Sequence, residues 1–222
     1  MSIIKVEYEM YSTTWRIHNA LVELQSLPVL SFDTETRGVY TAEEREEAKQ
    51  YLKEENISVS DRALALQVAE NSGLSFPTLI RVTHFIFGVS ESKSIVLVCA
   101  QPSMEKLIWQ WIASYNGKLL VHNTSYDLKI MYSRIGKMPK DYEDTALLAK
   151  CLINDAEVWK AKVGLKDLMG SYYDPAWSLM DDYEPDDLKK GSFLMYAAID
   201  GAATFKLWYD MQSWMGVEDE NK

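Results

Sequence analysis

Two acidic residues, separated by one residue, follow an apolar segment near the start of the chain. The run PVLSF (28–32) ends at Asp33, Thr34 and Glu35. Side chains alternate between the two faces of a strand, so Asp33 and Glu35 point to the same side. Two adjacent carboxylates repel each other unless a proton or a cation lies between them. The pair therefore indicates either a solvated strand end or a site for a divalent cation.

Two later segments carry acidic residues at helical spacing. In HNTSYDLKI, Asn123 and Asp127 are four positions apart, which predicts one shared face of a helix that directly follows a strand. In YAAIDGAATF, Tyr196 and Asp200 have the same spacing, and the residues around Asp200 are small and apolar. A carboxylate in such a setting is costly to bury unless something compensates for it. The alternatives are an exposed Asp127 and an Asp200 bonded to a backbone amide.

The three motifs occur in an order that resembles a known family. D-x-E after a strand, N-x-x-x-D on a helix and Y-x-x-x-D on a late helix resemble the DEDD exonucleases. Tyr196 in the last motif resembles their Tyr subgroup (DEDDy), which includes the proofreading domain of family A DNA polymerases and ribonuclease D. YEDTALLAKCL and GLKDLMGSYY resemble further segments of the family. The resemblance runs from about residue 29 to 208, apart from two inserted helices.

The resemblance implies a two-metal active site that holds Mg²⁺ or Mn²⁺. Asp33 would contact both cations, and Glu35 and Asp200 would complete the first cation site. Asp127 would hold the second cation. Tyr196 would orient the attacking water, because a hydroxyl with a pKa near 10 is a poor base. These five residues are the predicted catalytic residues, and the four acidic ones are the predicted metal ligands.

Five further residues are predicted to bind substrate. Thr34 and Thr36 would bond the sugar or phosphate of the terminal nucleotide, with local satisfaction of their hydroxyls as the alternative. Asn123 would position that nucleotide and Tyr126 would contact it. Val39 stands where relatives often carry an apolar wedge between the last two bases.

The elements around these motifs predict the fold class. A first strand, a helix from Thr13 or Thr14 to about Leu27, and a strand from Val29 to Asp33 open the chain. The strand pattern resumes at Leu79 after two helical segments, so these segments look inserted. The expected fold is α/β and ribonuclease H-like (DnaQ-like exonuclease), with a central mixed sheet flanked by helices. Later expected segments are strands at 79–90, 93–100 and 118–123, and helices from Pro102, at 124–136, 142–153, 164–173 and 192–215.

The 222 residues are expected to form a single 3′–5′ exonuclease domain with a helical insertion at about 40–75. This insertion lies close to the expected substrate entrance. It is expected to be a lid, a strand-separating element or a docking surface, and plain decoration of the fold is the alternative. The chain stops soon after the third motif, so no polymerase domain is expected.

The composition narrows the class of protein further. A net charge of −10 argues against a protein that coats duplex nucleic acid by electrostatic attraction. No apolar stretch approaches the ~20 residues that a membrane span needs, and no signal-peptide pattern is present. Cys99 and Cys151 lack CxxC spacing and are expected to be reduced core residues. We therefore expect a cytoplasmic protein with no membrane partner, encoded by a cell, a virus or a phage.

These observations favour one activity over two others. The first hypothesis is a stand-alone metal-dependent 3′–5′ exonuclease that acts on the 3′ ends of single-stranded or frayed DNA and releases nucleoside 5′-monophosphates. Its acidic charge suggests a partner, such as a DNA polymerase or another replication protein. The second hypothesis is a ribonuclease D-like exoribonuclease, since the same carboxylates would serve RNA. The third is a non-catalytic module that binds nucleic acid or a polymerase, in which loss of a carboxylate would be expected.

Overall fold

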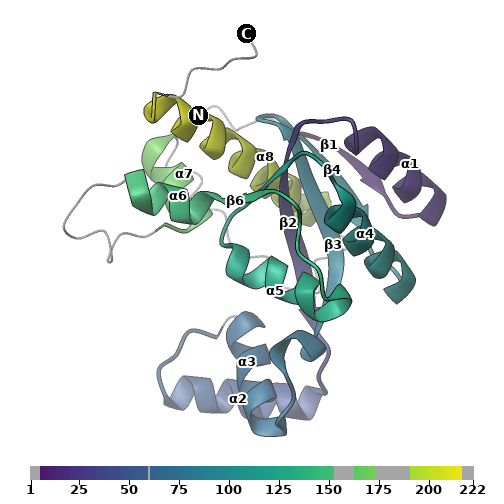
Figure 1. The fold of residues 1–222 in the computed structure, drawn as a ribbon. Helices are drawn as coiled ribbons and strands as arrows, with labels where there is room; N and C mark the ends of the chain where they lie inside the picture. The colour runs from purple at the N-terminus through teal and green to yellow at the C-terminus, as the bar shows by residue number, and fades with distance from the viewer. Residues whose placement is uncertain (1–5, 60, 153–162, 174–190, 217–222) are drawn as a thin grey trace. The chain divides into compact units, whose positions relative to one another are not determined.

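A computed structural model describes residues 6–59, 61–152, 163–173 and 191–216. Its contacts divide the chain into two compact units. The first unit comprises described residues of 1–34 and 84–222, and the second unit comprises residues 35–83. The first unit carries most of the sheet and six helices among the described residues (Figure 1).

The sheet is mixed, as the sequence predicts. Its six strands among the described residues follow the order β1-β4-β3-β2-β5-β6. The β3 and β4 strands pair antiparallel, whereas β1 with β4, β2 with β5, and β5 with β6 pair parallel. The bounds are β1 Glu7–Tyr11, β2 Val29–Gly38, β3 Ile80–Ser90, β4 Lys93–Val98, β5 Lys118–Val121 and β6 Tyr142–Asp144.

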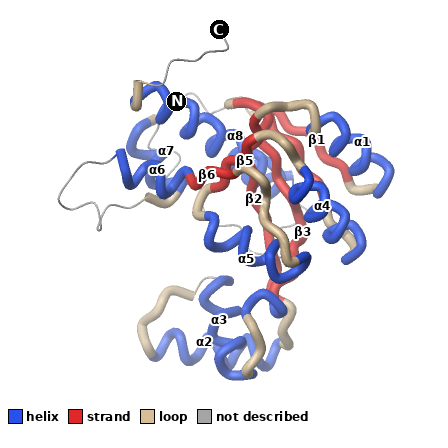
Figure 2. Tube along the Cα trace, in the orientation of Figure 1, coloured by secondary structure: helices blue, strands red, loops and turns tan. Residues whose placement is uncertain are grey.

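The two faces of the sheet in the first unit carry different helices (Figure 2). Phe32 packs against Trp109 of α4, with ring centroids 5.7 Å apart, so the even-numbered positions of β2 face α4. The hydroxyl of Ser31 donates to the carbonyl of Gly201 in α8 at 2.6 Å, so the odd-numbered positions face α8. The helices of this unit are α1 Thr14–Leu24, α4 Pro102–Ser114, α5 Thr124–Ile135, α6 Thr145–Leu152, α7 Leu165–Tyr172 and α8 Gly191–Trp214.

Aromatic rings fill the core on the α4 face. Phe85 lies edge-on to Trp109 at 4.7 Å between centroids, and Phe87 lies 5.5 Å from Phe32. All four side chains are at most 1% exposed. Burial of such large rings stabilises a fold by roughly 1.5–3 kcal/mol each, so this cluster holds β2 and β3 in a constant position.

The second unit contains the two inserted helices that the sequence predicts. The helix α2 spans Ala42–Glu54, α3 spans Asp61–Ser72, and the short 3₁₀ helix η1 spans Phe76–Leu79. Thr41 and Glu44 form a reciprocal capping box at the start of α2. After α3, Gly73 adopts a φ of +68°, which a glycine reaches without steric cost.

Several predicted boundaries differ from the structure. The strand β2 continues to Gly38, so Asp33 and Glu35 lie within it and not at its end. Its neighbour β5 pairs with it only as far as Phe32, and this is where the acidic positions begin. The helix α1 ends at Leu24, three residues earlier than expected.

Two other predictions were wrong in part. Residues 142–144, expected to be helical, form the edge strand β6, because they pair with β5 before α6 begins. Cys99 is buried, but Cys151 is exposed and so is not a core residue. Among the described residues, no helix combines the length and apolar character that crossing a membrane would require.

Candidate active site

The helix α8 approaches the sheet closely at Gly201, the residue after Asp200. A Cβ on Gly201 would lie 2.7 Å from Cγ2 of Ile86 and 3.0 Å from the hydroxyl of Ser94. Gly88 of β3 is equally confined, since a Cβ there would lie 2.4 Å from the carbonyl oxygen of Gly201. The missing side chains let the helix backbone touch the strands, and this contact places Asp200 above β2.

Two hydroxyls tie α8 to the sheet at this point. Ser31 donates to the carbonyl of Gly201 at 2.6 Å, and Ser94 donates to the carbonyl of Ala198 at 2.7 Å. Ser31 is also the acceptor for the backbone N–H of Gly88 at 3.0 Å. These bonds lie on the same side of β2 as Asp33, because positions 31 and 33 share one face.

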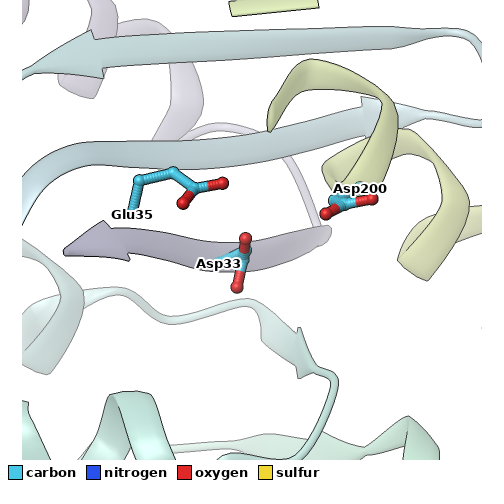
Figure 3. A group of neighbouring side chains, drawn as sticks. All are labelled: Asp33, Glu35 and Asp200. Carbon is cyan, nitrogen blue, oxygen red and sulfur yellow. The ribbon is translucent and has the colours of Figure 1, made fainter. Parts of the chain in front are cut away.

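Three of the four predicted metal ligands come together there. Asp33 and Glu35 of β2 and Asp200 of α8 each offer a carboxylate oxygen, and these atoms lie within 4.8 Å of one another (Figure 3). Figure 3 shows the three side chains converging from the strand and the helix. We call Asp33, Glu35 and Asp200 the carboxylate cluster.

The donor set of this cluster fits a divalent cation. Three carboxylate oxygens in so small a space repel one another unless positive charge lies among them. Hard oxygen ligands favour Mg²⁺ or Mn²⁺, which commonly use carboxylates together with water. The prediction that Asp33, Glu35 and Asp200 belong to one site is therefore consistent with the geometry.

Asp127 lies outside the carboxylate cluster but close to Asp33. It is 3% exposed, and its Oδ1 accepts a hydrogen bond from the hydroxyl of Thr34. Burial raises the pKa of Asp33, and the nearby charge of Asp127 raises it further. Burial likewise raises the pKa of Asp127, against the opposing effect of the bond from Thr34. The charge of Asp127 thus disfavours the ionised form of Asp33.

Thr34 consequently has a role that the sequence did not predict. Its side chain is 6% exposed and donates to Asp127, so the hydroxyl is engaged within the protein. This matches the alternative of local satisfaction that was considered for the threonines. Position 34 lies on the opposite face of β2 from positions 33 and 35. The bond from Thr34 therefore joins β2 to α5 on the face opposite the carboxylate cluster.

The carboxylate of Asp144 sets the position of α5 and therefore of Asp127. It accepts hydrogen bonds from the backbone N–H groups of Asn123 and Thr124 at 3.1 and 2.9 Å, and from the Thr124 hydroxyl at 2.8 Å. It also accepts from the N–H groups of Ala146 and Leu147 at the start of α6, at 2.9 and 3.2 Å. One side chain thus caps two helices.

Asn123 lies at the N-cap of α5, before the helix begins. Its φ of +65° and ψ of 65° are left-handed, so the predicted helical spacing between Asn123 and Asp127 was wrong. The side-chain oxygen of Asn123 accepts a bond from the hydroxyl of Ser125 at 2.7 Å, and the residue is exposed. Asparagine tolerates this backbone conformation better than most residues.

Tyr196 is held by a lysine to which the sequence analysis gave no role. The ammonium of Lys166 in α7 donates to the hydroxyl of Tyr196 at 2.5 Å and lies 4.4 Å from the centre of its ring. The charge of Lys166 also lowers the pKa of Asp33, although burial and Asp127 outweigh this effect. The segment GLKDLMGSYY contained this residue, and only its place in the folded chain singles it out.

The remaining predicted substrate residues are spread over both units. Thr36 and Val39 belong to the second unit, where Val39 is 52% exposed. Tyr126 lies in the first turn of α5, one residue before Asp127, and is partly buried. Contact of Val39 and Tyr126 with a nucleotide stays a prediction.

Solved structures resemble this chain over nearly its whole length. NrnC of Brucella melitensis, in the structure with bound pGG, is 15% identical with a TM-score of 0.57, and the match covers 97% of this chain and 85% of NrnC. Escherichia coli RNase D, an exoribonuclease involved in structured RNA processing, is 16% identical with a TM-score of 0.55 over 94% of this chain and 46% of that chain. The chain has the ribonuclease H-like exonuclease fold.

The predicted fold class is thereby confirmed. Trypanosoma brucei RNase D, in its complex with the RNA U12, is 14% identical, with a TM-score of 0.56 over 98% of this chain and 65% of that chain. NrnC has also been solved with bound Mg²⁺. No family model and no curated protein matches the chain in sequence.

Proposed function

We propose that this chain is a divalent-metal-dependent 3′–5′ exonuclease that hydrolyses phosphodiesters at single-stranded 3′ ends. The observation that carries the proposal is the carboxylate cluster, formed by two residues of β2 and one of α8 on the fold of NrnC and RNase D. The proposal treats residues 1–222 as one exonuclease domain in which residues 40–75 are an insertion.

Each residue of the site has a distinct task in this proposal. Asp33, Glu35 and Asp200 would hold one cation, and Asp127 would join Asp33 in holding a second. When bound, such cations lower the pKa of water and neutralise the charge that develops on the leaving oxygen. Water would attack phosphorus in line and lose a proton, the bond from phosphorus to the 3′ oxygen of the preceding nucleotide would break, and that oxygen would gain a proton as the nucleoside 5′-monophosphate leaves.

Tyr196 would orient the attacking water through its hydroxyl. The oxygen of that hydroxyl accepts a bond from Lys166, so its proton points away from the ammonium. A fixed hydroxyl aligns a water at lower entropic cost than a rotating one. Tyr196 is therefore a positioning group in this scheme and not the base.

RNA is the substrate that we propose first. The similar solved structures include an exoribonuclease and a complex with RNA. DNA is the second candidate, because the order of the three motifs also resembles the proofreading domains of polymerases. A DNA polymerase or another replication protein as a partner belongs only to this second candidate. The carboxylates themselves do not distinguish the sugars, since the 2′-hydroxyl must be read by other contacts.

The test uses matched single-stranded RNA and DNA of one sequence, labelled at the 5′ end. Purified protein with Mg²⁺ or Mn²⁺ should produce a descending ladder, preferentially on RNA, and a blocked 3′ end should protect the substrate. Asp33→Ala and excess EDTA should abolish the ladder. A ladder only on DNA would select the second candidate, and no ladder on either would refute the exonuclease.

A further inference from the structure

A histidine at the end of β5 joins three segments of the first unit. His122 directly follows Val121, the last residue of β5, and its side chain is partly buried. Nδ1 of its imidazole lies 2.9 Å from the hydroxyl oxygen of Thr145, the first residue of α6. Nε2 lies 2.9 Å from the carbonyl oxygen of Val163, two residues before α7 begins. The sequence analysis gave His122 no role.

These two partners determine which nitrogen of the imidazole carries the proton. A backbone carbonyl can only accept a hydrogen bond, so Nε2 is the donor to Val163. In the neutral ring Nδ1 is then an acceptor, and the hydroxyl of Thr145 donates to it. Burial lowers the pKa of His122 and so favours the neutral ring, against the opposing effects of the Val163 carbonyl and the charge of Asp144. Both nitrogens are therefore engaged in a single ring orientation.

The bond from His122 holds the segment that leads into α7. Gly164, the N-cap residue of this helix, has no side chain that could cap it. The carbonyl of Gly164 accepts the first helical bond, from the N–H of Leu168 at 3.0 Å. On the other side of the imidazole, Thr145 is fully buried. The start of α7 is thus connected through one imidazole to a buried residue of α6.

Lys166 connects the start of α7 with the active site. It lies in the first turn of α7, three residues after Val163. Its ammonium donates to the hydroxyl of Tyr196 at 2.5 Å and lies 4.4 Å from the centre of that ring. Holding a long lysine side chain in one geometry costs conformational entropy, and movement of its backbone would add to this cost. The contact with Tyr196 therefore depends on how firmly the first turn of α7 is held.

Other contacts hold the body and the far end of α7. Leu168 and Met169 are buried. Tyr173, the C-cap residue, donates to the carboxylate of Asp210 in α8 at 2.5 Å. Tyr173 lies about 10 Å along the helix axis from Lys166, at 1.5 Å per residue. Loosening this end should therefore lower stability without first moving Lys166.

We propose that His122 is a positioning residue for hydrolysis, which holds the start of α7 so that Lys166 fixes the hydroxyl of Tyr196. This inference rests on the proposed function, since that function gives Tyr196 the task of orienting the attacking water. His122 acts only through the donor at Nε2 in this scheme. A side chain that keeps a donor at that place should therefore keep the rate, and one that lacks it should not.

The test compares His122→Gln with His122→Asn. The amide nitrogen of glutamine reaches as far as Nε2 and can donate to Val163, whereas that of asparagine reaches only as far as Nδ1. His122→Asn should lower kcat on 5′-labelled single-stranded RNA about 3- to 10-fold, the effect of one lost hydrogen bond. KM should stay within about twofold, because no substrate contact is removed. His122→Gln should keep kcat within about twofold of the wild type.

The loss in His122→Asn should disappear when Lys166 is already absent. The double variant with Lys166→Met should be no slower than Lys166→Met alone, because the histidine acts through the lysine. Tyr173→Phe is the matched control, since it removes one hydrogen bond from the other end of the same helix. It should lower the melting temperature and leave kcat unchanged.

A measurement on the wild-type protein does not depend on whether any variant folds. Nitrogen NMR distinguishes the two neutral tautomers of imidazole, and the chain has three histidines to assign. We expect the Nε2–H tautomer at His122. The Nδ1–H tautomer would overturn the inference, because Nε2 could then not donate to the carbonyl of Val163.

The remaining outcomes separate this inference from the proposed function. Hydrolysis at the wild-type rate by His122→Asn, equal losses in His122→Asn and His122→Gln, or losses that multiply with Lys166→Met would each overturn the inference and leave the exonuclease standing. Absence of hydrolysis by the wild-type protein, with the Nε2–H tautomer present, would refute the exonuclease and leave the bond from His122 to Val163 standing.

Discussion

In the carboxylate cluster, repulsion between neighbouring carboxylates lowers the stability of the folded protein when no cation is bound. Asp33 is pushed toward its neutral form by burial and by Asp127, and Glu35 and Asp200 lie within 4.8 Å of it. Such strain is expected where a cation is meant to bind, because the cation reverses the electrostatic repulsion.

Asp33→Asn should therefore raise the melting temperature of the metal-free protein at pH 8 while removing the response to Mn²⁺. The wild type should gain about 2.7 kcal/mol at a cation concentration 100 times the Kd. Differential scanning fluorimetry with and without Mn²⁺ measures both effects. Asp141→Asn, which alters an exposed carboxylate 4.0 Å from Lys118, is the control and should keep the response. An undiminished response in Asp33→Asn would contradict the assigned site.

Lys166 and Tyr196 should act as one unit in hydrolysis. Tyr196→Phe is expected to lower kcat about 10²-fold, and Lys166→Met about tenfold, because the hydroxyl loses its fixed orientation. The double variant should be no slower than Tyr196→Phe, since the lysine acts through the tyrosine. Losses that multiply in the double variant would show that Lys166 acts independently.

A second lysine–tyrosine pair, between Lys206 of α8 and the C-cap residue of α7, provides the control for this cycle. Lys206 lies 4.9 Å from the ring centre of Tyr173 and bonds Asp210 at 3.0 Å. Lys206→Met removes a similar cation over an aromatic ring without touching the cluster. It should leave kcat unchanged, so a loss in this variant would point to a general effect on α8.

The close approach of α8 to the sheet depends on the absence of a side chain at Gly201. Gly201→Ala would gain about 1 kcal/mol of helix propensity, but its Cβ would lie 2.7 Å from Ile86. Overpacking costs about 1–3 kcal/mol, so we expect net destabilisation and reduced hydrolysis. Urea unfolding measures the change.

The shared cap of α5 and α6 makes Asp144 the residue that links two helices. Burial alone would raise its pKa, but hydrogen bonds from Thr124, Leu147 and Asn123 lower the pKa overall. Asp144→Ala should destabilise the protein by about 1–4 kcal/mol, since two caps are lost at about 0.5–2 kcal/mol each. Asp144→Asn should recover part of this loss. Equal unfolding free energies for wild type and alanine variant would contradict the role.

The stability of the whole protein should depend on pH through a buried histidine. Burial lowers the pKa of His84 to about 4, from an ordinary value of 6.5. In the unfolded chain the imidazole of His84 binds a proton below about pH 6.5, whereas in the folded chain it does so only below about pH 4. The free energy of unfolding therefore falls as the pH falls from about 6.5 to about 4. The loss is about 3 kcal/mol at most.

His84→Gln removes this titration. Between pH 7 and 4, the free energy of unfolding of the variant should therefore decline less than that of the wild type. Chemical unfolding at several pH values measures it. His18, an exposed histidine of α1, is the control position, and His18→Gln should follow the wild-type curve. Parallel curves for wild type and His84→Gln would contradict the expected shift.

Chain order and periodicity were enough to predict much of this protein. The D-x-E, N-x-x-x-D and Y-x-x-x-D motifs identified the family resemblance, and the apolar segments located β2, β3, β4 and β5. The two helical segments expected after the first motif correspond to α2 and α3. These features are local, because alternation along strands and helical spacing depend only on neighbouring residues.

Such local patterns could not predict contacts between distant parts of the chain. Four features depend on contacts between segments that are distant in the sequence. They are the continuation of β2 through Glu35 to Gly38, the strand at residues 142–144, the bond from Thr34 to Asp127, and the contact of Lys166 with Tyr196. Asn123 was misplaced because its left-handed backbone is coupled to Asp144, 21 positions away. A sequence motif names the groups that can do chemistry, but long-range packing decides which of them meet, since that energy comes from surfaces that only the folded chain brings together.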